Sequence, residues 1–191
     1  MIYVCVDCEA SGPMAPLYNL LSIGATTVHD RDGAVELGET FYVELKPIFS
    51  GFDPGALAVC GLDPERLRRD GLEPREAMER LRDWVAERSG PDDGRPVFVG
   101  HNAVFDWAYV AYYFAHVGLD NPFGYKGIDS KSLAMGRLGL PWEQTSKERL
   151  ESLLDLPPQD SARIHRADYD SWYQAWILKR LIERRPAAPI A

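Results

Sequence analysis

The sequence is poor in the features that mark secreted and membrane proteins. Its 191 residues include only three cysteines, too few for a disulfide framework. Charged residues or glycine interrupt every long apolar stretch, so no transmembrane span is predicted. The first ten residues, MIYVCVDCEA, have no basic region and soon become acidic, unlike a signal peptide. We therefore expect a cytoplasmic protein with one domain at 1–185 and a flexible tail at 186–191.

Positive charge is also scarce. The chain has 21 Lys and Arg against 29 Asp and Glu, a net charge of −8, which argues against tight non-specific binding to duplex nucleic acid. The imbalance is uneven, because residues 1–125 hold 10 basic and 20 acidic groups whereas residues 126–191 hold 11 and 9. Acidic residues that bind cations also contribute to this negative sum. The balance still allows an enzyme that engages a few nucleotides at one end of a strand.

Cys5 and Cys8 form a C-x-x-C pair, a spacing found in redox and zinc sites. The surrounding segment 2–8 is apolar and β-rich, and residues three apart on a strand face opposite sides of a sheet. The sequence offers no second cysteine pair to complete a zinc site. We therefore expect both cysteines to be small core residues.

The order of the predicted elements indicates an α/β domain. Three β-rich segments come first, at 2–8, 20–29 and 39–46, separated by turn-forming residues. Two shorter strands, at 97–99 and 126–129, then alternate with segments of helical spacing. The helices are predicted at 53–60, 64–70, 74–89, 103–117, 130–138, 147–154 and 166–184. Such an order is typical of a mixed sheet flanked by helices.

Asp7 and Glu9 at the end of the first predicted strand are the first candidates for a functional site. Residues i and i+2 on a strand point to the same face, so the two carboxylates project together. Acids that share apolar surroundings repel each other and lose solvation, and a bound divalent cation removes that cost. Oxygen ligands favour Mg²⁺ or Mn²⁺ over zinc. Taken alone, the pair could instead be two exposed acids at a strand edge.

Two later clusters add further candidates. Asp106 ends the segment GHNAVFD, where a predicted strand leads into a helix. Asp168 and Asp170 lie two apart on the last predicted helix, about 200° around its axis, so they cannot both face one site. His165 precedes Asp170 by five residues and can lean over the same site. Taken singly, Asp106 could be an exposed acid and His165 a capping or surface histidine.

Together, the three clusters resemble the DEDDh branch of the DnaQ-like exonuclease superfamily. The family pattern is D-x-E near the N-terminus, H-N-x-x-F-D in the middle and H-x-x-x-x-D near the end. This sequence has D-C-E at 7–9, H-N-A-V-F-D at 101–106 and H-R-A-D-Y-D at 165–170. The sister DEDDy branch carries Tyr four residues before the last Asp, where this chain has Arg166. The similarity continues through LSIGA at 21–25, AVCGL at 58–62 and IDS at 128–130, and so spans residues 2–182.

The resemblance implies an RNase H-like fold, in which an antiparallel three-stranded start is joined by parallel strands into a mixed five-stranded sheet. It implies that two Mg²⁺ or Mn²⁺ ions are bound by Asp7, Glu9, Asp106 and Asp170, with His165 as the general base. The implied reaction is hydrolysis of the 3′-terminal phosphodiester of single-stranded DNA or RNA, short oligonucleotides included, to release 5′-mononucleotides. The implied contacts to the terminal nucleotide are Ala10, Ser11, Gly12, Asn102, Phe105 and Cys60.

Two segments depart from the family pattern where its members hold the terminal nucleotide. Residues 10–12 read A-S-G instead of T-T-G or M-T-G, and Cys60 stands in place of a loop histidine. The choice between DNA and RNA is therefore open, as is a homodimer. Two sets of side chains have alternative interpretations. The first set could contact phosphates or form solvated surface: Lys147, Arg149, Arg163 and Arg166. The second set could belong to the core or to an interface: Trp172, Tyr173 and Trp176.

Two other classes of function compete with an exonuclease. A non-catalytic module that binds nucleic acid or protein could use the same fold, but here all five catalytic positions are filled. An aspartyl-phosphate enzyme would use D-x-D, whereas the second acid here is Glu9 and no matching Lys/Thr pattern follows. A metal-dependent 3′–5′ exonuclease is therefore the favoured hypothesis.

Overall fold

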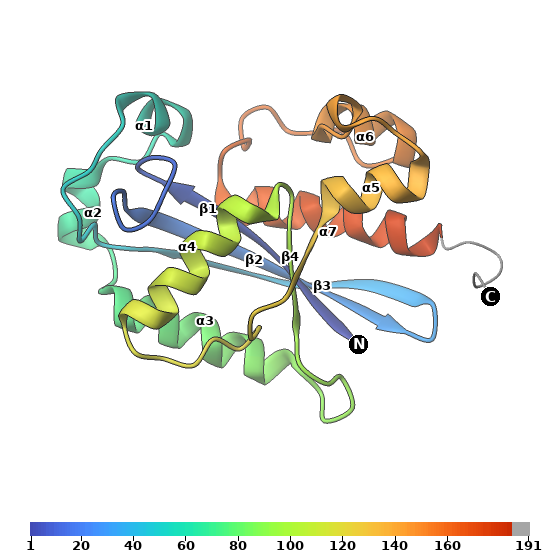
Figure 1. The fold of residues 1–191 in the computed structure, drawn as a ribbon, viewed down its shortest axis with the longest axis horizontal. Helices are drawn as coiled ribbons and strands as arrows, with labels where there is room; N and C mark the ends of the chain where they lie inside the picture. The colour runs from blue at the N-terminus through green and yellow to red at the C-terminus, as the bar shows by residue number, and fades with distance from the viewer. Residues whose placement is uncertain (185–191) are drawn as a thin grey trace.

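A computed structural model describes residues 1–184 and shows one five-stranded sheet flanked by helices (Figure 1). The strand order is β3-β2-β1-β4-β5. β1 pairs antiparallel with β2, and β2 with β3, whereas β4 and β5 continue the sheet in parallel with β1. The strands are β1 (Ile2–Ala10), β2 (Leu20–Arg31), β3 (Ala34–Glu44), β4 (Val97–Gly100) and β5 (Gly127–Asp129). The predicted mixed sheet is confirmed.

The helices form a layer on each face of the sheet. α3 and α4 cover one face, and α7 crosses the other against β1, β2 and β3 (Figure 1). Caps fix several helix starts, because Asp53, Asp63, Asp129 and Ser146 accept hydrogen bonds from first-turn amides. The helices are α1 (Pro54–Cys60), α2 (Pro64–Asp70), α3 (Pro74–Arg88), α4 (Ala103–His116), α5 (Ser130–Leu138), α6 (Lys147–Leu154) and α7 (Ala167–Glu183).

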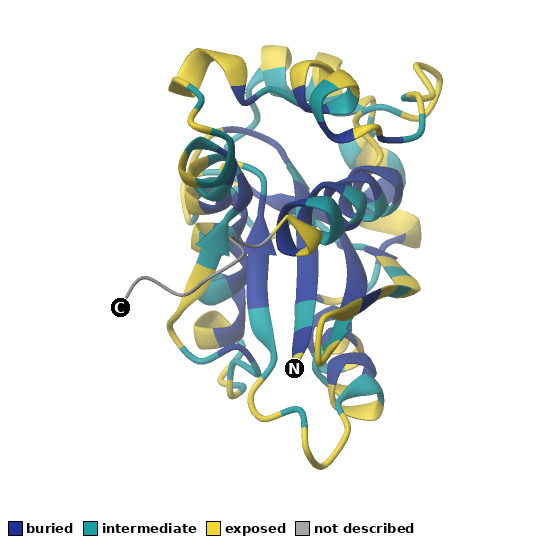
Figure 2. Cartoon of the chain, turned by 90° about the vertical axis from the view of Figure 1, so that its right-hand side faces the viewer, coloured by how far each residue is buried: buried dark blue, intermediate teal, exposed yellow. Residues whose placement is uncertain are grey.

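β1 alternates its side chains between the two helical layers. Val4, Val6 and Cys8 belong to the core beneath α3 and α4, whereas Cys5 packs with residues of α7. Cys5 and Cys8 are buried and on opposite faces, which confirms them as core residues. The sheet centre is buried along most of its length (Figure 2). By the same alternation, Asp7 falls on the α7 face of the sheet.

Of the three aromatic residues of α7 predicted to be core or interface, Tyr173 is a core residue and the two tryptophans are partly buried. Tyr173 is fully buried in a second cluster formed with α5 and α6, and Trp172 and Trp176 pack against it. This cluster fastens α6 to α7 through Leu150 and Leu154. Within residues 1–184, no helix has the length and apolar content needed to cross a membrane.

The structure differs from the sequence-based prediction in element boundaries and in one short helix. β3 begins at Ala34 rather than at residue 39, because the tight turn at Asp32–Gly33 joins it directly to β2. Trp142–Gln144 form a 3-10 helix that was not predicted. Cys60 ends α1 half-buried and outside the core clusters. The predicted tail at 186–191 lies outside the described residues.

Gly24 on β2 allows the start of α7 to touch the sheet. A methyl group at this position would lie 1.9 Å from the carbonyl oxygen of Ala167, the first residue of α7. Gly24 is also the partner of Asp7 across the β1–β2 ladder. The close approach therefore determines how far Asp170, in the first turn of α7, lies from Asp7.

We predict that Gly24→Ala lowers the free energy of unfolding by roughly 1–3 kcal/mol, because the added methyl group must push backbone atoms apart. The matched control is Gly136→Ala in α5, where a methyl group would meet nothing within 4 Å. That change should leave stability unchanged or raise it by about 0.4–1 kcal/mol. Urea denaturation of both variants is the measurement. Equal stability of the two variants would contradict the proposed close contact.

Candidate functional site

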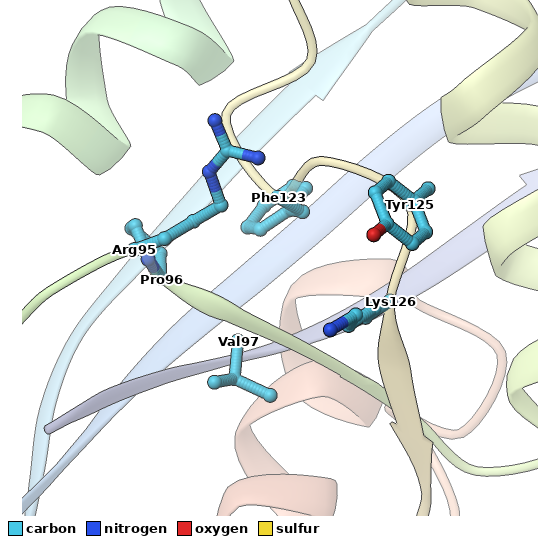
Figure 3. A pocket seen from close by; sticks show the side chains of 6 residues that line it. All are labelled: Arg95, Pro96, Val97, Phe123, Tyr125 and Lys126. Carbon is cyan, nitrogen blue, oxygen red and sulfur yellow. The ribbon is translucent and has the colours of Figure 1, made fainter.

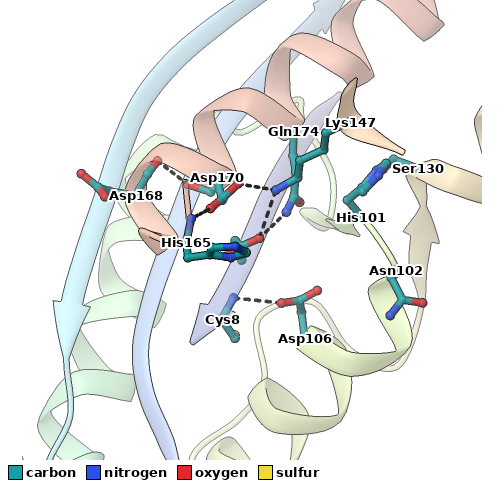
Figure 4. A network of polar contacts seen from close by, with 12 residues as sticks. Cys8, His101, Asn102, Asp106, Ser130, Lys147, His165, Asp168, Asp170 and Gln174 are labelled. Atoms are coloured by element: carbon teal, nitrogen blue, oxygen red, sulfur yellow. Dashed lines mark hydrogen bonds and ion pairs between the residues drawn. The ribbon is translucent and has the colours of Figure 1, made fainter. Parts of the chain in front are cut away.

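Four carboxylates from three separate elements converge near the C-terminal end of β1. Asp7 and Glu9 come from β1, Asp106 from the first turns of α4 and Asp170 from the first turn of α7. The backbone N–H of Cys8 donates to Oδ1 of Asp106 at 2.9 Å (Figure 4). This amide is available because the pairing of β1 with β4 spans Tyr3–Cys5 and ends before Cys8. Asp106 is 4% exposed, so its carboxylate is held in place within the protein.

The loop before α7 places His165 beside Asp170. His165 has a positive φ of 65°, and its backbone N–H donates to Oδ2 of Asp170 at 2.7 Å. Ligand atoms of Glu9, His165 and Asp170 all lie within 4.8 Å of one another. The His165 side chain is exposed, whereas Asp170 is buried.

Asp168 points away from this cluster, as the helical geometry predicted. Its carboxylate forms ion pairs with Arg166 at 3.2 Å and Arg163 at 3.8 Å. These two arginines, candidate phosphate contacts by sequence, are therefore engaged outside the carboxylate site.

Two further side chains reach the carboxylates. The Lys147 ammonium pairs with Oδ1 of Asp170 and lies 3.8 Å from Oδ1 of Asp7 (Figure 4). The Gln174 amide donates to the same oxygen of Asp7 at 2.6 Å. Sequence reasoning missed Gln174, although it lies four residues after Asp170 and so on the same side of α7. It named Lys147 only as a candidate phosphate contact.

Asp129 holds the connection between β4 and α4. Its Oδ2 accepts from the N–H groups of Asn102 at 2.9 Å and Ala103 at 2.8 Å, and its Oδ1 accepts from Ser132. His101 next to this connection is hydrogen-bonded through Nδ1 to Oγ of Ser130 at 2.8 Å. Burial and nearby lysine charges lower the pKa of His101 to about 3, so its ring is neutral. These residues orient α4 and thereby Asp106.

An open cavity of about 500 Å³ adjoins the carboxylates between the end of β1 and α1. Three predicted nucleotide contacts line it, namely Ala10, Gly12 and Phe105. The other three predicted contacts, Ser11, Asn102 and Cys60, do not line it. The remaining lining residues are Glu9, Pro13, Asp53, Gly55, Ala56 and Val59.

The Ser11 side chain points into the protein and does not line the cavity. It is fully buried, its hydroxyl donates to the carbonyl of Gly51 at 2.7 Å, and it accepts from the N–H of Asn19 at 2.8 Å. Cys60 directs its thiol to the Leu57 carbonyl. Asn102 is an exposed residue with a positive φ of 75° at the start of α4.

A second hollow of about 280 Å³ lies at the opposite end of β4 from α4, between the segment Arg95–Val97 and the segment that leads into β5 (Figure 3). Its lining contains Arg95 and Lys126 but no acidic residue. None of the residues predicted for the site lines it. The carboxylate cluster is therefore the better candidate for chemistry.

Burial and neighbouring charges raise the pKa values of three of these carboxylates, Asp7, Glu9 and Asp106. Burial, followed by the charges of Asp7 and Asp170, raises the pKa of Glu9 to about 9. Burial also raises the pKa of Asp7 to about 7, although Lys147 opposes the rise. The pKa of Asp106 is raised well above its usual value, first by burial and then by Asp7. One ammonium faces four acids here, and this donor set fits divalent cations with hard oxygen ligands.

We predict that chelator-treated protein loses stability as the pH rises from about 4.5 to 9. Unfolded Glu9 ionises near its ordinary value of 4.5 and folded Glu9 near 9, so the folded state holds the proton more tightly across that window. At pH 8, Glu9→Gln should therefore raise the free energy of unfolding by roughly 1–3 kcal/mol. Saturating Mg²⁺ should stabilise the wild type more than the variant. Denaturation of wild type and Glu9→Gln at pH 5 and 8, with chelator and with Mg²⁺, measures these changes in stability. A Glu9→Gln variant less stable than wild type at pH 8 in chelator would refute the raised pKa of Glu9.

The chain is similar in sequence to known exonucleases. Residues 2–182 match the family model described as the 3′-5′ exoribonuclease Rv2179c-like domain. The chain is 40% identical over 184 residues to the 3′-5′ DNA exonuclease Cap18 of Escherichia coli, an alignment that covers 96% of this chain and 92% of Cap18. It is 30% identical over 191 residues to Ribonuclease T of Pectobacterium atrosepticum, with 95% of this chain and 81% of Ribonuclease T covered.

Solved structures share its fold. The nuclease domain of 3′hExo, a DEDDh family member bound to rAMP, matches with a TM-score of 0.77 at 15% identity, covering 94% of this chain and 90% of that domain. The E. coli exonuclease I–single-stranded DNA complex matches with a TM-score of 0.71 at 22% identity, covering 97% of this chain and 41% of exonuclease I. These matches confirm the expected RNase H-like fold. The chain belongs to the Rv2179c-like family of 3′–5′ exoribonuclease domains and is a 3′–5′ exonuclease of the DEDDh type.

Proposed function

We propose that the protein hydrolyses the 3′-terminal phosphodiester of single-stranded DNA or RNA and releases 5′-mononucleotides in a metal-dependent reaction. The observation that carries the proposal is that ligand atoms of Glu9, His165 and Asp170 lie within 4.8 Å of one another, with Asp7 and Asp106 close enough for their charges to raise the pKa of Glu9. The nearby cavity gives the terminal nucleotide a place next to these acids. The similar proteins include a DNA exonuclease and a ribonuclease by name, so both single-stranded DNA and single-stranded RNA are proposed as substrates.

The four carboxylates would hold two Mg²⁺ or Mn²⁺ ions. When bound, such ions lower the pKa of a coordinated water and stabilise negative charge on the leaving 3′-oxygen. The raised pKa values of Asp7 and Glu9 support this role, because burial disfavours their charges unless a cation compensates. Gln174 orients Asp7 through its hydrogen bond, and the Cys8 N–H orients Asp106.

His165 is proposed to accept the proton of the attacking water. Its backbone is fixed on Asp170, while its exposed ring lies close to the ligand oxygens of Glu9 and Asp170. A ring in this position can reach a water held by those acids and can pass the proton on to solvent.

The terminal base is proposed to lie in the cavity against Phe105 and Val59. Phe105 packs on Tyr109 with ring centroids 5.3 Å apart, and Val59 is 55% exposed on α1. Ala10 and Gly12 are small enough to let the ribose approach Glu9. Ser11 would act indirectly, because its hydroxyl joins the β1–β2 loop to the segment at Gly51.

We predict that Asp7→Asn abolishes measurable exonuclease activity and that His165→Ala lowers the rate by about 10²–10⁴-fold. Asp168→Asn is the matched control, because Asp168 lies two residues before Asp170 on α7 but pairs with Arg166 away from the site. The assay uses 5′-labelled single-stranded DNA and RNA with Mg²⁺. The control should give the same 3′→5′ ladder as wild type. A ladder retained by Asp7→Asn would refute the proposed site.

The proposed base contact predicts that Phe105→Ala raises KM, since base stacking on an aromatic ring is worth about 1–3 kcal/mol, or roughly 5–150-fold. Val104→Ala is the control, because Val104 is 75% exposed and does not line the cavity. Steady-state kinetics on an oligonucleotide distinguishes the two variants. An unchanged KM for Phe105→Ala would place the terminal base elsewhere.

A further inference from the structure

Lys147 is a cation inside the carboxylate cluster that comes from an element supplying none of the acids. It is the first residue of α6, and its side chain is 18% exposed. Its ammonium pairs with Asp170 and lies 3.8 Å from Oδ1 of Asp7. The side chain therefore bridges two carboxylates that belong to different elements.

The backbone of Lys147 is fixed by the attachment of α6. The helix itself does not explain why the Lys147 ammonium lies near the acids. Ser146 caps α6, and the buried Leu150 and Leu154 attach the helix to α7. A cation at a helix N-terminus is disfavoured by the helix dipole. The attraction of Asp7 and Asp170 therefore accounts for where the ammonium lies.

Three of the four carboxylate oxygens that Asp7 and Asp170 could offer a metal already have partners. Oδ1 of Asp170 is engaged by Lys147, and Oδ2 accepts from the backbone N–H of His165. Oδ1 of Asp7 accepts from Gln174 while facing Lys147. A divalent ion and an ammonium that share one carboxylate oxygen would repel each other strongly at such short range in a buried site.

We propose that Lys147 is a built-in counter-ion that competes with divalent metal for Asp7 and Asp170, so that metal binding displaces its ammonium from Asp170. The inference rests on the proposed metal-dependent function. Lys147 offsets part of the charge of Asp7 and Asp170 in metal-free protein and weakens their affinity for metal. The enzyme therefore needs a higher metal concentration than the same four carboxylates would need without the lysine.

The test is calorimetric titration of Mn²⁺ into chelator-stripped protein. Lys147→Met removes the charge at similar length and should tighten Mn²⁺ binding by about tenfold or more. Lys147→Arg keeps the charge and should bind no more tightly than wild type. Lys131→Met is the control, because that ammonium lies 4.3 Å from the Trp142 ring, and it should leave the affinity unchanged. Unchanged or weaker Mn²⁺ binding by Lys147→Met overturns the proposal.

A second measurement needs no variant. Brief reductive methylation of wild-type protein, quantified by mass spectrometry, should label Lys147 slowly without metal and severalfold faster with saturating Mg²⁺ at the same pH. Lys126 and Lys131 serve as internal references. Equal or slower labelling of Lys147 with Mg²⁺ overturns the displacement.

Strand degradation, assayed in parallel, separates the two proposals. Wild-type degradation with unaltered Mn²⁺ affinity in Lys147→Met refutes the counter-ion alone. Absence of both degradation and Mn²⁺ binding in wild type and variant refutes the counter-ion and the proposed function together.

Discussion

Mutual repulsion among four carboxylates in one buried corner is the constraint on which the rest of the structure depends. Burial disfavours the charges of Asp7, Glu9 and Asp106, and the charge of at least one neighbouring carboxylate adds to the effect for each. Such an arrangement opposes folding unless cations or hydrogen bonds compensate. The compensation visible in the protein comes from Lys147, Gln174 and two backbone N–H groups. The remaining negative charge is what makes the corner suitable for divalent metal.

The fold brings the acids together by ending several elements at one place. β1 extends beyond the residues that pair with β4, and this leaves the Cys8 N–H available for Asp106. Gly24 lets α7 begin directly against the sheet, so that Asp170 reaches the Asp7 side of β1. Asp129 fixes the first turn of α4 from the neighbouring strand. A scaffold of strand ends and helix starts thus holds the acids more rigidly than a loop could.

Local periodicity was sufficient to predict much of this arrangement. The i, i+2 rule placed Asp7 and Glu9 on one face, and helical geometry separated Asp170 from Asp168. Contacts between distant segments were beyond its reach. Nothing near Lys147 in the sequence indicates that its ammonium meets Asp170, 23 residues away. The hydrogen bond of the Ser11 hydroxyl could not be predicted for the same reason, since its partner Gly51 lies 40 residues further along the chain.

We propose that these four carboxylates form one metal site beside the cavity lined by Glu9 and Phe105. The most direct test of this proposal is a crystal structure grown with Mn²⁺ and a nucleoside 5′-monophosphate, with anomalous scattering used to locate the metal. We predict anomalous peaks about 2 Å from oxygens of Asp7 and its partner acids, with the base against Phe105. Crystals that contain Mn²⁺ but show no peak at these carboxylates would contradict the account.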